Sequence, residues 1–363
     1  MVRFFRSLIL LLLPVVMAAC NMEEGAREQM VNLQQVQDNP QAQLAQLNAA
    51  IAQSQRDGSL HARRAVVLLR NGALQKALAD ADKAVQLTRN DPASLFVKAQ
   101  VLRAMGKREE ALPLALQAEH NSYQSASLYV LLGELYLQQK KYALAREYIS
   151  KAQELSPANE YAYYYKGRLL ATTGDTTRAL RNYNLALEQM PQLMEAQREV
   201  AGILVAQKDL EGAKPYLRRA SKLAPKDALV LYYSGLAYEQ AQQPDSAQLY
   251  FNRALAVNDT LQHAHYFLGM QLYKQGDAEG ALAHLLNAQR QYKNAPRYLA
   301  ILAGSYERTG QVVNALSTYQ RLVQVEPKYT YAYGAIARLK YKLQKPALPV
   351  QQEESSAPVI IEE

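Results

Sequence analysis

One spacing runs through most of this chain: small residues recur every 34 positions without a slip. The first series places alanine or glycine at Ala65, Ala99, Gly133, Gly167, Ala201, Gly235, Gly269, Ala303 and Ala337. A second series, twelve positions further along, is made only of alanine: Ala77, Ala111, Ala145, Ala179, Ala213, Ala247, Ala281 and Ala315. A period of this length indicates a repeat architecture, in which each unit buries its apolar face by stacking on its neighbours.

Each period divides into two apolar-periodic segments of about fourteen residues, which a short polar turn separates. Such turns include QKK at 139–141 and TGD at 173–175. Alanine, leucine and glutamine are plentiful, whereas glycine (16) and proline (14) are few, which favours helices. Small residues at fixed positions allow two helices to approach closely. The sequence therefore predicts a helix–turn–helix unit in each period.

The pattern of conserved spacing within a unit is specific. Gly133, Ala145, Ala152 and Pro157 have counterparts at Gly167, Ala179, Ala186 and Pro191. This resembles the tetratricopeptide repeat (TPR) family over residues 57–343. The resemblance implies an all-α fold, a right-handed α-solenoid of eight 34-residue helix–turn–helix repeats at 57–329. The proline that closes a unit in this family is replaced at four junctions, by Arg89, Tyr123, Asp259 and Lys293.

A stack of repeats needs a cover at each end. Residues 40–56 are predicted to form an N-terminal half-repeat helix that covers the first unit. Residues 330–344 are predicted to form a C-terminal capping helix with one apolar and one polar face. Residues 345–363 are rich in proline and acidic residues, so a disordered tail is predicted there.

The first twenty residues have a separate character. Arg3 and Arg6 precede a short apolar run, and two alanines stand directly before Cys20, the only cysteine. These are features of a secretory signal peptide, and the position of the cysteine resembles the bacterial lipoprotein signal. The resemblance implies a signal peptide at 1–19, lipidation of Cys20, and a membrane-proximal tether at 20–39. Met17 departs from the leucine that is usual three residues before the cysteine.

The lipoprotein resemblance also implies a location. Asn21 after the cysteine, rather than aspartate, implies transfer to the outer membrane. The expected site is the periplasmic face of that membrane, and two glutamates after the cysteine leave surface exposure open. A plain signal peptide or an anchor helix with an incidental cysteine is the alternative.

Several function classes receive no support. The net charge of +8 comes from basic residues dispersed among acidic ones, so no nucleic-acid surface is predicted. Phosphate-binding glycine motifs and HExxH are absent. His263 and His265 stand two apart, so on a helix they point to different faces. We therefore expect no enzyme, no cofactor and no metal site.

The resemblance places ligand contacts on the first helix of each unit, which lines the concave surface in the TPR family. The first units are bland there, with Ser59, Ala62 and Ala93, whereas later units offer aromatic and cationic side chains. Tyrosine and arginine dominate binding energy at protein interfaces, although each tyrosine alone is also a common packing residue in TPR helices. The candidate partner-binding groove consists of Tyr161, Tyr164, Arg168, Arg198, Tyr232, Tyr266, Tyr273, Lys274 and Arg297.

These features together predict a lipid-anchored scaffold or adaptor. Its groove is expected to bind protein or peptide segments of envelope proteins, and so to assemble or recruit cell-envelope components. The alternative is a surface lipoprotein that captures glycans or peptides for uptake. The sequence leaves the partner and the oligomeric state open.

Overall fold

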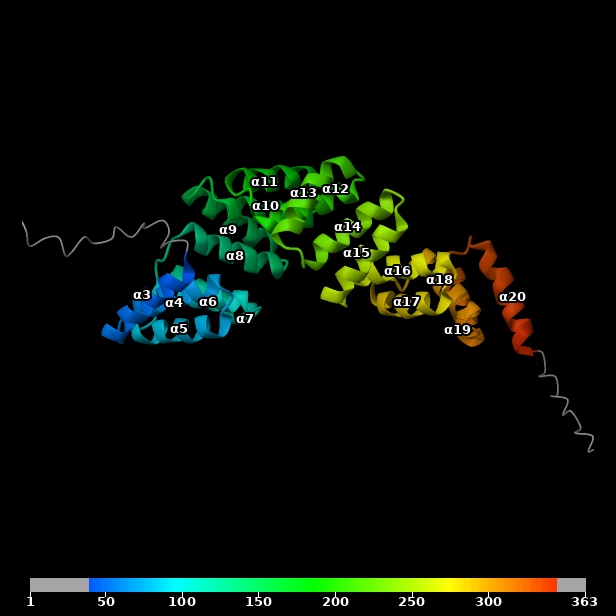
Figure 1. Cartoon of the computed structure of the whole chain (residues 1–363), viewed down its shortest axis with the longest axis horizontal. Helices are drawn as coiled ribbons and strands as arrows, with labels where there is room; N and C mark the ends of the chain where they lie inside the picture. The colour runs from blue at the N-terminus through cyan, green and yellow to red at the C-terminus, as the bar shows by residue number, and fades with distance from the viewer. Residues whose placement is uncertain (1–38, 345–363) are drawn as a thin grey trace, which may run out of the picture. The chain divides into compact units, whose positions relative to one another are not determined.

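The computed structural model describes residues 39–344. The predicted signal peptide at 1–19, the predicted lipidation site at Cys20 and the predicted tail at 345–363 lie outside the described residues. The tether predicted at 20–39 also lies outside them except for Asn39. Within the described part, eighteen helices follow one another and no strand occurs (Figure 1). None of the helices there is long and apolar enough to cross a membrane. The predicted all-α class is confirmed.

The chain divides into two compact units, and the division falls between Tyr165 and Lys166, inside α10 (Glu160–Thr172). The first unit contains α3 (Pro40–Gln53), α4 (Gly58–Arg70), α5 (Leu74–Leu87), α6 (Pro92–Ala104), α7 (Arg108–His120), α8 (Ala126–Gln138) and α9 (Tyr142–Leu155). The second contains α11 (Thr176–Gln189), α12 (Met194–Ala206), α13 (Leu210–Leu223), α14 (Ala228–Gln240), α15 (Pro244–Val257), α16 (Gln262–Gln275), α17 (Ala278–Tyr292), α18 (Pro296–Arg308), α19 (Val312–Val325) and α20 (Thr330–Gln344).

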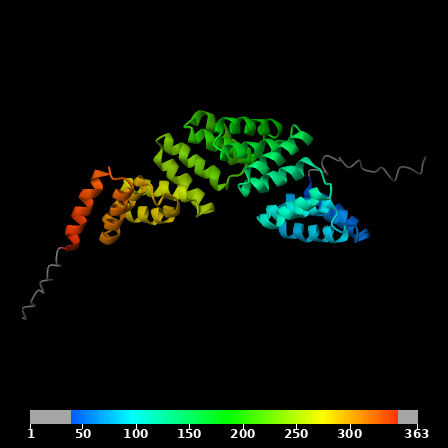
Figure 2. The ribbon, with the colours of Figure 1, turned by 180° about the vertical axis from the view of Figure 1, so that it is seen from behind.

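The helices pair as the period predicts, a first helix with the second helix of the same repeat. The pair α16 and α17 is in contact along its length, as both views of the ribbon show (Figures 1 and 2). All eight alanines of the second series are fully buried. Because an alanine side chain is only a methyl group, full burial at a helix crossing lets the two backbones come close together. The 34-residue register is thus confirmed.

Local signals explain where the helices begin and turn. Aspartate side chains cap several first helices: Asp57 accepts a hydrogen bond from the Ser59 amide, and Asp91 accepts one from the Ser94 amide. The turn between the two helices holds one residue in the left-handed region at the same position of each period. Five of these residues are glycine, which adopts that conformation without steric cost: Gly72, Gly106, Gly174, Gly276 and Gly310, with Lys140, Lys208 and Gln242 in the other three.

The end helices have one buried face each. In α3, Ile51 is buried and Leu47 and Ala50 are half-buried. This helix ends at Gln53, three residues before the predicted limit, because the backbone of Ser54 leaves the helical region. At the other end, α20 packs on α19 and buries Ala332, Ala335 and Leu339.

Candidate functional site

The predicted groove residues differ widely in exposure. Tyr161 (41 % exposed), Lys274 and Arg297 are open to solvent. Arg168, Arg198 and Tyr273 are half-buried. The remaining three, Tyr164, Tyr232 and Tyr266, are buried. Exposure alone therefore separates side chains that a partner reaches directly from side chains that are mostly part of the core.

The buried tyrosines offer a partner little surface. The Tyr164 ring is 4 % exposed and lies edge-on to the Tyr165 ring, with 5.0 Å between the centroids. The Tyr232 ring lies 5.8 Å from the ring of Phe251, and burial raises the pKa of its hydroxyl. These contacts match the packing role that tyrosine has in TPR helices. A partner-binding role for these rings stays a prediction, and exposure supports it less than it does for Lys274 or Arg297.

A cluster of aromatic side chains forms around repeat seven. The rings of Tyr266 and Tyr292 stack with centroids 4.1 Å apart and an interplanar angle of 18°. The imidazole of His263 lies edge-on to Tyr292 and 5.9 Å from the ring of Tyr232. We call these four residues the aromatic cluster. It joins α14, α16 and α17 within the second unit.

Both ring nitrogens of His263 have hydrogen-bonding neighbours. Its Nδ1 lies 2.5 Å from the Tyr292 hydroxyl, and its Nε2 lies 2.8 Å from the side-chain nitrogen of Gln291. The tautomer of the ring decides which of the two nitrogens donates and which accepts. Burial lowers the pKa of His263 and raises that of Tyr292 to about 12, so both groups are uncharged near neutral pH.

The sequence reasoning missed Tyr292 and Gln291, which come from the end of a second helix. In repeat seven, α17 runs one residue further than the other fourteen-residue second helices, because Lys293 keeps helical dihedral angles (φ −47°, ψ −27°). At the position that Tyr292 has in the period, Ser156 (φ −144°, ψ 88°) and Asn258 (φ −143°, ψ 98°) have left the helical region. The extra residue is Tyr292. The available signal was the replacement of the closing proline by Lys293, together with an aromatic residue beside it.

Three charged side chains lie near the aromatic cluster. Burial raises the pKa of the Glu239 carboxyl, and the positive charges of Lys274 and Arg297 act against that rise. The three residues come from α14, α16 and α18. Since Lys274 and Arg297 are exposed while Glu239 is half-buried, the cations remain open to an incoming anion. We call these three residues the charged rim.

Other predicted groove residues are held by contacts within the chain. The Arg198 guanidinium lies 3.0 Å from carboxylate oxygens of both Glu199 and Asp227. The Arg308 guanidinium lies over the Tyr273 ring, 4.2 Å from its centroid, and also donates to the Tyr273 carbonyl. These two groove positions are therefore already engaged, unlike the charged rim.

A hollow of about 420 Å³ borders the aromatic cluster. Its lining comes from the start of α16 and the end of α17: Thr260, Leu261, Gln262, His263, Arg290 and Gln291. His263 thus connects the cluster to a solvent-open recess within the second unit.

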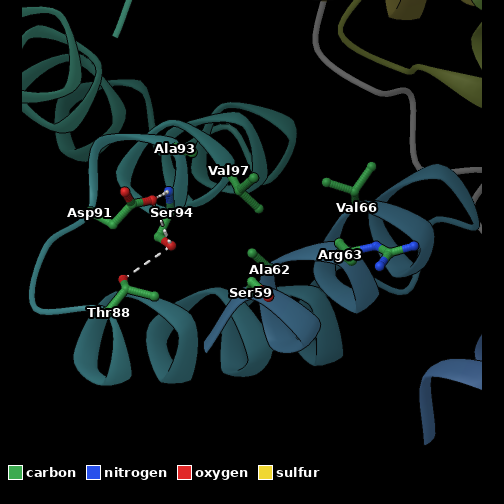
Figure 3. A pocket seen from close by; sticks show the side chains of 9 residues that line it. All are labelled: Ser59, Ala62, Arg63, Val66, Thr88, Asp91, Ala93, Ser94 and Val97. Atoms are coloured by element: carbon green, nitrogen blue, oxygen red, sulfur yellow. Dashed lines mark hydrogen bonds between the residues drawn. The ribbon is translucent and has the colours of Figure 1, made fainter. Parts of the chain in front are cut away.

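A larger hollow, about 570 Å³, lies in the first unit, where the sequence reads as bland (Figure 3). It lies between α4 and α6, and its apolar lining includes Ala62, Val66 and Val97. The Thr88 hydroxyl donates to the Ser94 oxygen at one side. The description of the first units as bland was therefore incomplete, because their short side chains leave a hollow that a binding surface can use.

Three of the other four histidines have contacts within the chain, whereas His120 is exposed. His265 is buried and contacts His284, with 2.9 Å between the two Nδ1 atoms. His61 is buried against Asp80, which Arg64 also holds at 2.6 Å. His263 and His265 thus face different surroundings, as their spacing predicts. Across residues 39–344, no group of three or more His, Cys, Asp or Glu side chains is arranged to hold a metal ion.

Comparison with known proteins identifies the repeat. The model of the tetratricopeptide repeat matches residues 30–94, 96–160, 201–262 and 266–331. A BBSome complex member, BBS4 of Bos taurus, is 26 % identical over 278 residues, which is 76 % of this chain and 53 % of that protein. The chain thus spans about half the length of this curated relative.

Solved structures agree on the fold. The crystal structure of the APC/C hetero-tetramer Cut9–Hcn1 superposes with a TM-score of 0.62 at 18 % identity, covering 82 % of this chain and 58 % of that chain. The structure of Pseudomonas aeruginosa pilF superposes with a TM-score of 0.52 at 22 % identity, covering 60 % of this chain and 97 % of that chain. At these identities the likeness concerns the fold.

Proposed function

Because the chain belongs to the tetratricopeptide repeat family, whose repeats act as scaffolds for protein–protein interaction, we propose that it is a lipid-anchored adaptor of a bacterial cell envelope. It binds segments of other envelope proteins and so assembles or recruits them. The observation that carries this proposal is the aromatic cluster with the charged rim beside it. Both are built from aromatic and charged groups of the kind that bind protein segments, and no catalytic step is part of the proposal.

The chemistry of this surface suits a polypeptide. Lys274 and Arg297 supply exposed cations for a carboxylate on the partner, and Glu239 is the anion that faces them. The neutral His263 and Tyr292 supply hydrogen-bonding groups at the edge of a recess. Aromatic and arginine side chains around a partly desolvated centre are the usual composition of an interaction hot spot.

Capture of glycans, the alternative from the sequence, gains less support. A sugar ring stacks on an open aromatic face. Tyr266 and Tyr292 cover each other's faces at 4.1 Å, and Arg308 covers Tyr273 at 4.2 Å. Tyr161 remains the most exposed tyrosine of the predicted groove. The surface therefore favours a protein segment over a carbohydrate.

Photo-crosslinking in living cells tests the adaptor proposal. The photoreactive residue replaces Lys274 or Arg297, because these side chains reach solvent, whereas Tyr164 and Tyr232 do not. The matched control places it at Lys222, an exposed lysine on α13. A discrete protein adduct at 274 and 297 that is absent at 222 is expected. Adducts that are equal at all three positions would contradict the assignment of the site.

A pair of double variants measures the contribution of the charged rim. Lys274→Gln with Arg297→Gln removes both exposed cations, and Arg218→Gln with Lys222→Gln removes two exposed cations from α13. Without the photoreactive residue, we expect co-purification of the partner that crosslinking has identified to fall about tenfold for the first pair and to stay unchanged for the second. Equal melting temperatures show that both variants remain folded.

Membrane attachment through Cys20 is a separate part of the proposal. Three acyl chains, as bacterial lipoproteins carry, contribute about 0.8 kcal/mol per buried methylene group and hold a protein at a bilayer stably. Cys20→Ser is expected to abolish labelling by an alkyne fatty acid and to move the protein from the outer-membrane fraction to the soluble fraction. Protease added to intact cells then distinguishes the periplasmic face, where the protein is spared, from the cell surface. An unchanged membrane fraction in Cys20→Ser argues for an uncleaved anchor instead.

A further inference from the structure

The last helix of the described residues, α20, has the position of a first helix, and no second helix follows it within residues 39–344. In earlier repeats the first series of small residues is covered by a second helix: a methyl group added at Gly133 meets Ile149 at 2.8 Å, and one added at Gly235 meets Phe251 at 2.7 Å. Ala337, the last member of that series, is exposed. Within the described residues, the face of α20 at Ala337 is therefore open where the earlier repeats place a second helix.

The open face is apolar along its centre. Tyr333, Ala337 and Tyr341 follow one another at intervals of four residues, so they share one side of the helix. Tyr333 is 51 % exposed and Tyr341 is 68 % exposed. We call these three residues the α20 stripe.

The same position of an earlier repeat shows what such a stripe normally contacts. Tyr129 in α8 corresponds to Tyr333 in the period, and it is buried. Its ring lies 6.1 Å from the ring of Tyr148 in the second helix α9. Tyr333 is thus an aromatic residue of the kind that a second helix covers, left without that helix in the described residues.

In the sequence after Gln344, the position of the first alanine of a further second helix is held by Pro349. The eight repeats all have alanine at this position. Proline has no amide hydrogen to donate inside a helix.

Charge narrows the choice of partner. Residues 330–344 include Arg338, Lys340 and Lys342 and no acidic residue. The Arg338 guanidinium is bound to Glu307 at 2.7 Å, whereas Lys340 and Lys342 are exposed. Lys340 is three residues after Ala337, so it lies beside the α20 stripe. A second copy of α20 would bring like charges together, so self-pairing through this face is disfavoured.

We propose that the α20 stripe is a docking surface for an acidic amphipathic helix of a partner protein, which completes a ninth repeat. Small residues on the incoming helix, as at Ala145 and Ala152 of α9, would let its backbone approach Ala337. Acidic side chains on its rim would pair with Lys340. This surface is distinct from the aromatic cluster and does not depend on it.

A synthetic peptide based on α9 serves as the probe. It carries residues 141–156 with R146E and K151E, which make it acidic, and it keeps both alanines. The full-length protein is titrated against the labelled peptide and binding is followed by fluorescence anisotropy. Two control peptides are used: the unaltered sequence, which tests charge, and the acidic peptide with A145Q and A152Q, which tests the close approach.

Protein variants place the binding on α20. Ala337→Gln puts a long side chain on the stripe at an exposed position, and Ala283→Gln makes the same change at an exposed position of α17. We expect the acidic peptide to bind the wild type and Ala283→Gln alike, and to bind Ala337→Gln about tenfold more weakly. Lys340→Glu with Lys342→Glu is expected to reverse the preference toward the unaltered peptide.

Other occupants of the stripe give different results, each of which overturns the proposal. Binding that ignores Ala337→Gln places the peptide elsewhere. A dimer in sedimentation that Ala337→Gln abolishes shows a second copy on this face. If neutralising the acidic tail (Glu353, Glu354, Glu362 and Glu363 to Gln) strengthens peptide binding about tenfold, the tail already occupies the stripe. No peptide binding by the neutralised-tail protein shows that the face accepts no helix.

Discussion

The first two repeats and repeat six solve the same packing problem with different residues. In repeats one and two, the small residue of the first helix and its counterpart sixteen positions later are both alanine: Ala65 with Ala81, and Ala99 with Ala115. In repeat six the same two positions are Gly235 and Phe251, and the phenyl ring lies where a methyl group on Gly235 would be. All of these side chains except the glycine are fully buried.

The comparison shows that the contact between the two helices of a repeat is filled in every case, although different pairs of residues fill it. The Phe251 ring requires glycine at position 235 because a side chain there would clash with it. In the first two repeats, the methyl groups of two alanines fill the corresponding contact. Volume-conserving exchanges are tolerated in cores, whereas a change on one side alone leaves a cavity or a clash. The same difference extends to the surface, because short side chains line the hollow of about 570 Å³ beside α4, whereas the smaller hollow of about 420 Å³ at the start of α16 borders stacked aromatic rings.

The largest loss of stability is expected in repeat six, where the Phe251 ring alone fills the contact between α14 and α15. Phe251→Ala removes a fully buried phenyl group that also stacks on Phe267 at 5.6 Å. We expect a loss of about 3–5 kcal/mol in the free energy of unfolding, since Gly235 has no side chain to fill the cavity. Urea unfolding of the full chain measures it, with Leu249→Ala on the exposed face of α15 as the control. A loss as small as that of the control would show that the crossing does not depend on the ring.

A double-mutant cycle tests whether the two solutions interconvert. Ala115→Phe alone overfills the crossing of repeat two and is expected to cost about 1–3 kcal/mol. Adding Ala99→Gly recreates the combination of repeat six and should recover part of that loss, although glycine in a helix costs about 0.5–1 kcal/mol. Denaturation of both single variants and the double variant gives the coupling energy. Strict additivity would mean that the two positions do not share one space.

The fold was accessible from the sequence because it depends on a strict period. The two series of small residues mark the position of every helix crossing, and five of the eight turns have glycine at one fixed place. The bound of α3 was less accurate, because the dihedral angles of Ser54 end the helix before the apolar pattern does. The sequence analysis also did not predict that an alanine pair and a glycine–phenylalanine pair fill the same contact, because this pattern is visible only when the two positions are compared together.

The candidate site was less accessible. The period assigns Tyr164, Tyr232 and Tyr266 to the groove, yet their rings lean into the core, because a tyrosine on a crowded helix surface buries its ring when neighbouring apolar groups are in reach. Tyr292 escaped prediction because its position depends on one additional helical residue at Lys293. Side-chain direction and helix length both depend on neighbours that a single period does not specify.

Alkaline titration sharpens the comparison between regions. Burial raises the pKa of Tyr292 to about 12, above the ordinary value of about 10. The folded state therefore holds this proton more tightly, so its contribution to stability is complete below about pH 10 and is lost as the pH rises to about 12. The first two repeats, residues 57–124, contain a single tyrosine, Tyr123, at their end. Alkaline loss should thus arise in the later repeats, where the buried tyrosines lie, the aromatic cluster among them.

The variant Tyr292→Phe measures this effect. It removes the ionising hydroxyl and keeps the ring against Tyr266, so the fall in melting temperature between about pH 10 and about pH 12 becomes less steep. Tyr341→Phe, whose ring is exposed, serves as the control and should retain the wild-type slope. A slope that Tyr292→Phe leaves unchanged would assign the alkaline loss to other buried tyrosines, such as Tyr298.

The smallest effect contrasts two glycines of first helices, Gly235 and Gly334. Gly235→Ala brings a methyl group to 2.7 Å from the Phe251 ring, so it should destabilise despite the better helix propensity of alanine. Gly334→Ala enters open space in the middle of α20 and should stabilise by about 0.5–1 kcal/mol, because alanine restricts the unfolded chain. Urea midpoints of the two variants are expected to shift in opposite directions. A destabilising Gly334→Ala would mean that something already covers this face of α20, whereas a stabilising change, lost once the acidic α9 peptide is bound, would place the peptide against Gly334.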